Sequence, residues 1–179
     1  MSPYLVELVV HAVKEKYVSE KAFYSEQLGI SPQSWDRWKK GDQGLKYENI
    51  QIIATLFTDY EWMLAQKVVR QADLMTDVIK DPVAEFIYLK HQIAKTWLSH
   101  DLARIEWSRS QENALGSLRK SNMVVLRLVA DYHIWGYSDI IEMRLPGLIQ
   151  QQIGHDQRKL LAWVEGEGAK YKDPSDLKV

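Results

Sequence analysis

The sequence has no cysteine among its 179 residues, and this absence excludes whole classes of site. Disulfide frameworks, thiolate nucleophiles, zinc ribbons and iron–sulfur clusters all depend on cysteine sulfur. Long hydrophobic runs are lacking too, because no segment approaches the roughly 20 apolar residues that cross a bilayer. We therefore expect a protein without cysteine chemistry and without a membrane span, located in the cytoplasm.

An excess of charge of one sign is also missing. Charged residues make up 26% of the chain, yet the formal net charge is only −1. A near-neutral chain is not drawn onto phosphate as a whole, so any nucleic-acid affinity must come from a local basic patch. Apolar residues account for 46% of the chain, which is enough for packed cores and predicts a globular protein.

Sequence motifs of catalysis are absent as well. There is no Gly-rich phosphate loop, dinucleotide fingerprint, His-Glu-x-x-His or Gly-x-Ser-x-Gly. On the predicted long helix, His100 is next to a carboxylate, that of Asp101, but adjacent residues on a helix do not face each other. No two histidines have the spacing of a helical metal pair. We expect no catalytic residue, no metal site and no cofactor, and interpret the chain as a binding protein rather than an enzyme.

The first half of the chain, residues 1–80, predicts a bundle of five helices. Apolar residues recur at the i, i+3, i+4 spacing of a buried helical face. The boundaries follow from capping residues: Ser19 and Ser31 as N-caps, Gly29 at a helix end, and Pro32 in the first helical turn. The expected helices are residues 3–16, 20–28, 32–41, 47–57 and 59–75, the last buried through Trp62, Met63, Ala65 and Val69.

The second half, residues 81–179, begins at Asp81-Pro82, where the proline disfavours a continuous helix. We expect one long helix over residues 83–109, because an apolar stripe continues through Leu102 and Ile105. A polar loop follows over residues 110–122. Residues 123–135 and 137–145 predict the two strands of a β-hairpin around Gly136, and a helix over residues 157–165 would cover it. The Gly-rich segment after Glu165 is expected to fray.

The expected fold class is thus α+β and mostly α: an N-terminal helix-turn-helix bundle, a long linking helix, and a C-terminal antiparallel hairpin with a terminal helix. A hairpin alone is marginal in water, so it must gain a third strand, a packed helix, or a strand from another subunit. Together with the long apolar helix, this predicts a homodimer.

The seven tryptophans divide into two groups. Five fall on predicted apolar stripes and are expected in the core: Trp35, Trp38, Trp62, Trp97 and Trp163. Trp107, near the end of the long helix, and Trp135, at the hairpin turn, are candidates for exposed anchors that bind a partner.

Residues 19–64 resemble the helix-turn-helix of the phage-repressor (Cro and repressor-like) superfamily. The resemblance rests on Leu28-Gly29-Ile30-Ser31, on residues 35–41 (Trp-Asp-Arg-Trp-Lys-Lys-Gly), and on the Ile-rich helix after them. It implies that residues 32–41 form a recognition helix for the major groove of DNA. The candidate nucleic-acid-binding residues are Gln33, Ser34, Arg37, Lys39, Lys40 and Lys46. The alternative is a bundle that serves only as a scaffold, since a fold does not fix a function.

The whole chain resembles the anti-CRISPR proteins of streptococcal and lactic-acid-bacterial phages, which inhibit type II-A RNA-guided nucleases. The resemblance is carried by Phe23-Tyr24, residues 34–41 and 57–61, the hairpin over residues 137–145, and residues 158–165 with Trp163. It implies a homodimer in the cytoplasm of a bacterial host, which binds the CRISPR effector nuclease and lowers its DNA affinity from a distance without catalysis. No contact residue is carried over. The alternative function is a DNA-binding transcriptional regulator of the phage-repressor type.

Overall fold

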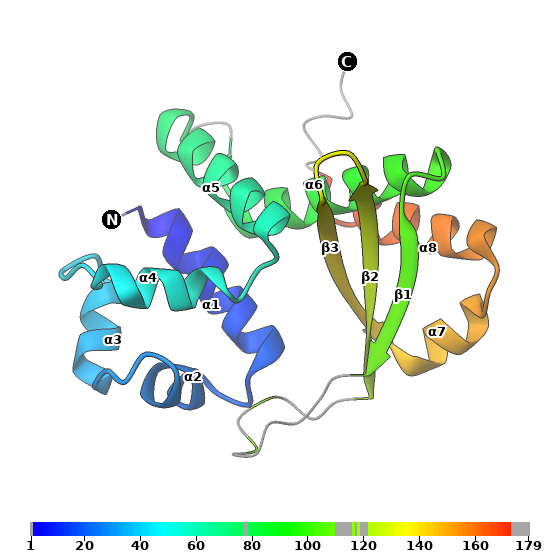
Figure 1. Ribbon diagram of the computed structural model, residues 1–179. Coiled ribbons are helices and arrows are strands. Elements are labelled where there is room, and N and C mark those ends of the chain that lie inside the picture. Colours follow the sequence, from blue (N-terminus) through cyan, green and yellow to red (C-terminus); the bar gives the residue numbers. More distant parts are fainter. Residues whose placement is uncertain (1, 77–78, 110–115, 117, 119–121, 173–179) are drawn as a thin grey trace. The chain divides into compact units, whose positions relative to one another are not determined.

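A computed structural model describes residues 2–76, 79–109, 116, 118 and 122–172. The fold is α+β and mostly helical, with a three-stranded antiparallel sheet and a C-terminal helix (Figure 1). The chain forms two compact units. Unit 1 contains Met1–Pro82 and Ser110–Ser121, and unit 2 contains Val83–Arg109 and Asn122–Val179. No helix among the described residues has the length and hydropathy needed to cross a membrane.

Within its described residues, unit 1 consists of five helices with short connections. They are α1 (Pro3–Lys16), α2 (Glu20–Glu26), α3 (Pro32–Lys39), α4 (Tyr47–Ala54) and α5 (Asp59–Leu74). These bounds agree closely with the predicted ones. Most of residues 110–122, the predicted loop, lie outside the described residues, but Leu118 forms an antiparallel bridge with Tyr17.

Capping residues set the boundaries of α2 and α3. The Ser19 hydroxyl accepts a hydrogen bond from Ala22 N at 3.1 Å, and the Ser31 hydroxyl accepts one from Ser34 N at 3.2 Å. Between the helices, Gly29 has a φ of +60°, a left-handed conformation that is costly for residues with a Cβ. The predicted caps at these positions are confirmed. The capping box of Thr58 and Glu61 at the start of α5 was not predicted.

An aromatic cluster forms the core of unit 1. Trp35 and Trp38 of α3 are fully buried, with ring centroids 4.7 Å apart. Phe23 and Tyr24 of α2 lie against Trp35, with centroid distances of 6.0 and 5.8 Å. The prediction that Trp35 and Trp38 are core residues is confirmed.

Two predicted core positions on α5 need correction. Met63, expected in the core, is exposed, and Trp62 is half-buried. The buried face of α5 is built from Leu64, Ala65, Val68, Val69 and Ala72. Met63 therefore lies just outside the apolar stripe of this helix.

The prediction of one long helix over residues 83–109 is wrong. In unit 2, α6 (Pro82–Ser99) ends early, and Arg104–Arg109 is a strand, β1. Asp101 turns the chain between them with a φ of +53°, a conformation that Asp adopts more readily than most residues. Leu102, predicted in the helical stripe, is exposed in this turn. The chain continues through β2 (Met123–Tyr132), β3 (Tyr137–Pro146), α7 (Gly147–Ile153) and α8 (Gln157–Ala169).

The three strands pair in the order β1-β2-β3, and all neighbours are antiparallel. The hairpin thus gains its third strand from its own chain. The register places Trp107 beside Leu126 and Leu126 beside Met143, and this face carries the buried residues Leu126, Leu128, Ile141 and Leu145. Figure 1 shows α6 and α8 behind the sheet. Because side chains alternate along a strand, the opposite face carries the charged residues Arg127 and Asp131 of β2, together with the buried Val125 and Val129.

The last helix is longer than predicted. α8 continues through Gly166 and Gly168 to Ala169, where the sequence predicts a frayed Gly-rich segment. Gly168 is buried, and a Cβ added to it would lie only 2.8 Å from His91 Cβ on α6. The close packing of the two helices explains both the glycine and the continued helix. Trp97 is buried, whereas Trp163 is half-buried.

Candidate partner-binding surfaces

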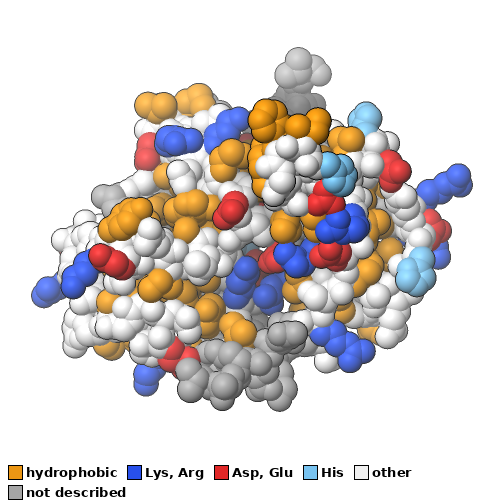
Figure 2. Space-filling model, viewed as in Figure 1, with side chains coloured by type: hydrophobic (Ala, Val, Ile, Leu, Met, Phe, Trp, Pro, Cys, Tyr) orange, Lys and Arg blue, Asp and Glu red, His pale blue; other side chains and the backbone are white. Residues whose placement is uncertain are grey.

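Among the described residues of unit 2, the turn between β2 and β3 and its flanking positions carry four exposed apolar or aromatic side chains. Ile134 is 92% exposed and Trp135 is 72% exposed, and Tyr132 and Tyr137 beside them are also exposed. We call these four residues the hairpin tip. Figure 2 shows hydrophobic side chains gathered over this turn. Contiguous exposed apolar patches are uncommon in monomeric proteins and mark sites of interaction.

Hydrogen bonds hold the backbone of the hairpin tip. Trp135 N and Gly136 N both donate to Tyr132 O, at 2.8 and 3.1 Å, and Gly136 has a φ of +69°. The rings of Tyr132 and Tyr137, a cross-strand pair, have centroids 5.4 Å apart. The side chains are therefore presented by an ordered turn. Rigid presentation reduces the entropy lost on binding.

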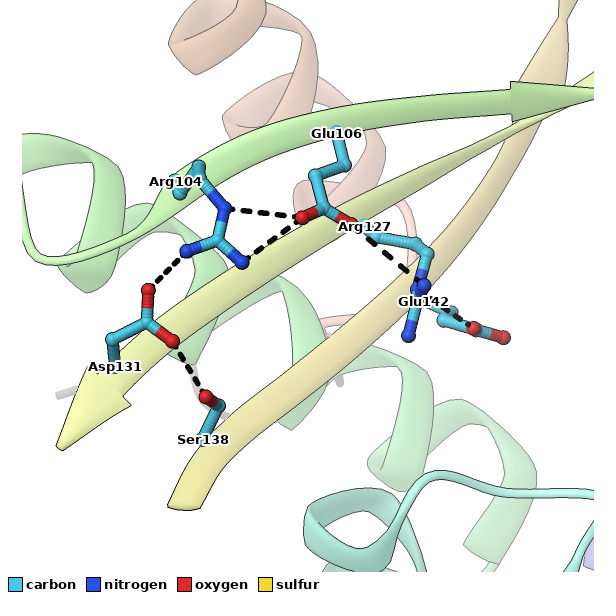
Figure 3. A network of polar contacts seen from close by, with 6 residues as sticks. All are labelled: Arg104, Glu106, Arg127, Asp131, Ser138 and Glu142. Atoms are coloured by element: carbon cyan, nitrogen blue, oxygen red, sulfur yellow. Dashed lines mark hydrogen bonds and ion pairs between the residues drawn. The ribbon is translucent and has the colours of Figure 1, made fainter. Parts of the chain in front are cut away.

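A polar network on the outer face of the sheet lies at the base of this turn (Figure 3). Asp131 Oδ2 forms an ion pair with Arg104 of β1, and Asp131 Oδ1 accepts a hydrogen bond from the Ser138 hydroxyl of β3 at 2.5 Å. Asp131 thus connects the three strands one residue before Tyr132. The hydrogen bond from Ser138 and the charge of Arg104 lower the pKa of Asp131 below its ordinary value.

The same network continues along the sheet as a charge ladder. Glu106, Arg127 and Glu142 are direct cross-strand neighbours. Arg127 Nη1 lies 3.7 Å from Glu106 Oε2, and Arg127 Nε lies 3.3 Å from Glu142 Oε1. Arg104 joins the ladder because its Nη2 lies 3.0 Å from Glu106 Oε1. Opposite charges on neighbouring strands stabilise one register of the sheet.

The two tryptophans expected to anchor a partner have different environments. Trp135 is exposed, as predicted. Trp107 is half-buried, because it lies on the inner face of β1 and lines a cavity with Ile105 and Leu160. It is therefore a cavity wall and not a projecting anchor. The environment of Trp107 follows from the strand that replaces the predicted helix end.

In unit 1, the outer side of α3 carries three of the six predicted nucleic-acid-binding residues. Gln33, Arg37 and Lys40 are exposed, and their spacing of four and three residues places them on one side of the helix. Ser34 is half-buried, and its backbone N donates to Ser31 at the helix cap. Lys46, also exposed, follows in the connection to α4. An outward row of Gln, Arg and Lys has the chemistry of direct base and phosphate contacts.

Lys39 is held differently from the other basic residues of α3. Its Nζ lies 2.9 Å from Glu20 Oε2 and 3.4 Å from Asp36 Oδ1. The hydrogen bond to Glu20 raises the pKa of Lys39. Trp35 Nε1 also donates to Glu20 Oε2, at 2.7 Å. Lys39 thus connects α2 to α3, and its charge is largely neutralised by these carboxylates.

Glu20 is the centre of this connection. Burial raises the pKa of Glu20, but hydrogen bonds from Trp35 and Lys39 outweigh burial, so its pKa lies below the ordinary value. The carboxylate stays ionised and fixes α3 against α2. The fixed angle between the two helices keeps the outer side of α3 turned away from the aromatic core.

Sequence reasoning missed most of the residues that shape the hairpin tip. Ile134 is next to Trp135 in the sequence, and a run of apolar residues at a turn was the available signal for it. Arg104, Asp131 and Ser138 gave no such signal, because their proximity depends on the register of the three strands. Among the described residues, no group of three His, Asp or Glu side chains is arranged to hold a metal ion.

Comparison with known proteins adds no relative. No protein-family model, curated protein or solved structure matches the chain. The geometry of the hairpin tip and of α3 is therefore the basis for a functional proposal.

Proposed function

We propose that the protein is a non-enzymatic binding protein that acts by docking the hairpin tip onto a protein partner. The observation that carries the proposal is the exposure of Ile134 and Trp135 on a turn fixed by hydrogen bonds and by Asp131. Trp and Tyr are enriched among the residues that dominate binding energy at protein interfaces.

The charges around the hairpin tip favour a protein over nucleic acid as its partner. The residues around it include Asp131 and Asp139 as well as His133 and Arg104, so there is no excess of positive charge to attract phosphate. An apolar pocket on a protein is the complementary surface. The type II-A RNA-guided nuclease implied by the resemblance to anti-CRISPR proteins is the partner we propose, within a bacterial cytoplasm.

The tip proposal predicts a loss of affinity in tip variants. Trp135→Ala should weaken binding to a guide-loaded type II-A nuclease by about 30-fold, the effect of losing roughly 2 kcal/mol at an interface hot spot. Tyr47→Ala is the matched control, because Tyr47 is an aromatic of unit 1 with a similar exposure of 71%. Surface-immobilised nuclease and purified protein variants provide the measurement. Equal affinities for the two variants would reject the tip as the docking site.

DNA binding through α3 is the second candidate function. It is favoured by the exposed row of Gln33, Arg37 and Lys40 on a short capped helix after a Gly turn, as in a helix-turn-helix. Lys39 contributes little to it because its ammonium group is paired. Acidic neighbours oppose it, since Asp36, Asp42 and Glu48 are also exposed. Counterion release would thus involve few phosphates.

Salt-dependent binding distinguishes the two candidates. If α3 reads DNA, Lys40→Ala should weaken binding to all duplexes and reduce the salt slope by about one, whereas Arg37→Ala should cost roughly 1–3 kcal/mol at one base position. Lys67→Ala and Arg70→Ala, exposed positions on α5, are the controls. Fluorescence anisotropy with labelled duplexes is the readout. A flat response to salt in the wild-type protein would leave the protein partner as the function.

We also propose that the protein is a homodimer. The structure changes the two features from which the sequence predicted this. β1 supplies the third strand that the hairpin needs, and α6 is shorter than expected. Neither feature now requires a second copy, so the homodimer rests on the resemblance to the anti-CRISPR proteins, and the hairpin tip stays free for the nuclease. We expect light scattering to give the dimer mass at micromolar concentration, and a monomer mass there would reject this part of the proposal.

A further inference from the structure

A cavity of about 230 Å³ lies in unit 2 between the inner face of β1 and the turn that joins α7 to α8. Its apolar walls are Ile105 and Trp107 of β1, Ile153 of α7 and Leu160 of α8. Ile153 and Leu160 are buried, and Ile105 and Trp107 are half-buried. Four apolar side chains from three elements thus surround space that no side chain fills.

The cavity follows from the backbone on both sides. β1 is an edge strand, so its inward side chains lie at the margin of the apolar layer and have a strand on one side only. On the other side, Gly154 ends α7 with φ +57° and ψ −124°, a conformation essentially restricted to glycine. This turn, with Ile153 before it and Leu160 after it, lines the same cavity as Trp107, whose side chain is half-buried.

The polar side chains of the lining, His155, Asp156 and Gln157, are exposed and form its mouth. The same three residues also border a second hollow of about 570 Å³ that reaches Leu98. Asp156 Oδ1 accepts hydrogen bonds from Arg158 N and Lys159 N, at 2.9 and 3.3 Å. Asp156 therefore occupies the anion-binding end of α8 itself, while its carboxylate adds negative charge at the mouth.

We propose that this cavity binds a small uncharged aromatic molecule with one N–H or O–H donor, of the indole class. The ring would pack on Trp107 and Leu160, and the donor would bond to the Asp156 carboxylate. Size agrees, because an apolar protein cavity of roughly 150 Å³ accepts benzene, and 230 Å³ leaves room for a second fused ring. The proposal is independent of the hairpin tip.

Other ligand classes fit this cavity less well. An anion would meet the Asp156 carboxylate at the mouth and find the N–H groups of the first turn already bonded. A metal ion would find one carboxylate and one imidazole, of Asp156 and His155, and no group of three such ligands occurs among the described residues. A long acyl chain needs a long channel, whereas the apolar walls here are four side chains from β1, α7 and α8. An uncharged ring system with a hydrogen-bond donor can pack on the apolar walls and also bond to the Asp156 carboxylate.

Titration of the full chain with indole, followed by two-dimensional ¹H–¹⁵N NMR, tests the proposal. We expect shifts at the Trp107 side-chain N–H and at the amides of residues 153–160. Trp107→Leu removes the aromatic wall and Ile105→Phe fills the cavity, so each should abolish these shifts. Trp135→Ala is the matched tryptophan control and should bind indole like the wild type. Two cavity variants are compared, so that the test still holds if one of them does not fold.

Ligand analogues separate the contribution of the Asp156 carboxylate from that of the apolar walls. Indene has the same shape without the N–H donor, and it should bind about three- to tenfold more weakly, the range expected for one hydrogen bond. Indole-3-acetate should bind more weakly than indole and recover in Asp156→Asn, which keeps a capping side chain without the charge. No shifts at millimolar indole, shifts confined to residues 132–137, or unchanged binding in both cavity variants would overturn the proposal.

Discussion

Gly168 shows how the absence of a side chain determines the packing of unit 2. It lies in α8 against His91 of α6, and an added Cβ would be 2.8 Å from His91 Cβ. Contacts this short do not occur between real atoms, so the helices must separate. A Cβ added to Gly166, two residues earlier in the same helix, would meet only open space. The two glycines are thus a matched pair with opposite environments.

We predict opposite effects for the two alanine substitutions. Gly168→Ala should lower the free energy of unfolding by about 1–3 kcal/mol, as overpacking does. Gly166→Ala should raise it by about 0.5–1 kcal/mol, because alanine is the better helix former. Urea denaturation of both variants is the measurement. Destabilisation of equal size in the two variants would contradict the packing of α6 against α8 through Gly168.

His91 of α6 is a buried titratable group. Its Nδ1–H donates to Ile87 O at 2.8 Å, and its ring lies against Trp163 and Tyr171, with centroid distances of 6.3 and 6.4 Å. Burial lowers the pKa of His91, and the charge of Lys90 lowers it further, while Ile87 and Glu167 oppose the shift. The folded protein therefore prefers the neutral ring.

This preference predicts a loss of stability in acid. Because the folded pKa lies below the unfolded value of about 6.5, the unfolded state binds the proton first as pH falls. The contribution of His91 is complete above that value and declines as pH falls toward its lowered pKa. Unfolding free energies of wild type and His91→Gln between neutral and mildly acidic pH should converge. Parallel curves for the two proteins would contradict a buried neutral ring.

At the scale of elements, unit 1 was largely predictable because its boundaries are set by local chemistry. Ser19, Ser31 and Gly29 act on backbone groups within three or four residues, so their roles can be read from sequence. α1 begins and ends where predicted, at Pro3 and Lys16. The aromatic core follows from the helical spacing of Trp35 and Trp38.

Unit 2 was less predictable because its strands depend on distant partners. Leu98, Leu102 and Ile105 continue a helical spacing by coincidence, so the local pattern predicts a helix end where β1 lies. The first five residues of β1 alternate polar and apolar side chains, but so short a pattern does not outweigh a longer helical one. The pairing of Ile105 with Leu128 is not visible in the local sequence. The Arg104–Asp131–Ser138 contacts depend on the same register.

We predict that this network orders the hairpin tip. Asp131→Asn removes the charge that pairs with Arg104, so the amides of residues 132–137 should exchange with solvent faster than in the wild type. Asp139→Asn, on the opposite face of the same hairpin, is the control and should leave exchange unchanged. Hydrogen exchange by NMR is the measurement. Equal exchange in both variants would show that the turn is ordered by its backbone alone.

At the scale of the molecule, two units with different surfaces share one nearly neutral chain. Unit 1 presents a short row of Gln33, Arg37 and Lys40, and one nearby cation, Lys39, is paired with carboxylates. Unit 2 presents an apolar tip, and Arg104 and Arg127 on its sheet are paired with carboxylates. If one surface dominates function, substitutions in the two units should have unequal effects. We propose that the tip of unit 2 dominates.

Inhibition of target cleavage by a guide-loaded type II-A nuclease tests this claim most directly, with three proteins compared over a range of concentrations. The wild type should inhibit. Arg37→Ala with Lys40→Ala should inhibit equally well, because the partner is held by a protein surface. Ile134→Ser with Trp135→Ala should require a concentration at least about 30-fold higher, as expected for a lost hot spot. A nuclease that is inhibited equally by the tip variant, or not inhibited by the wild type, would contradict the proposed function.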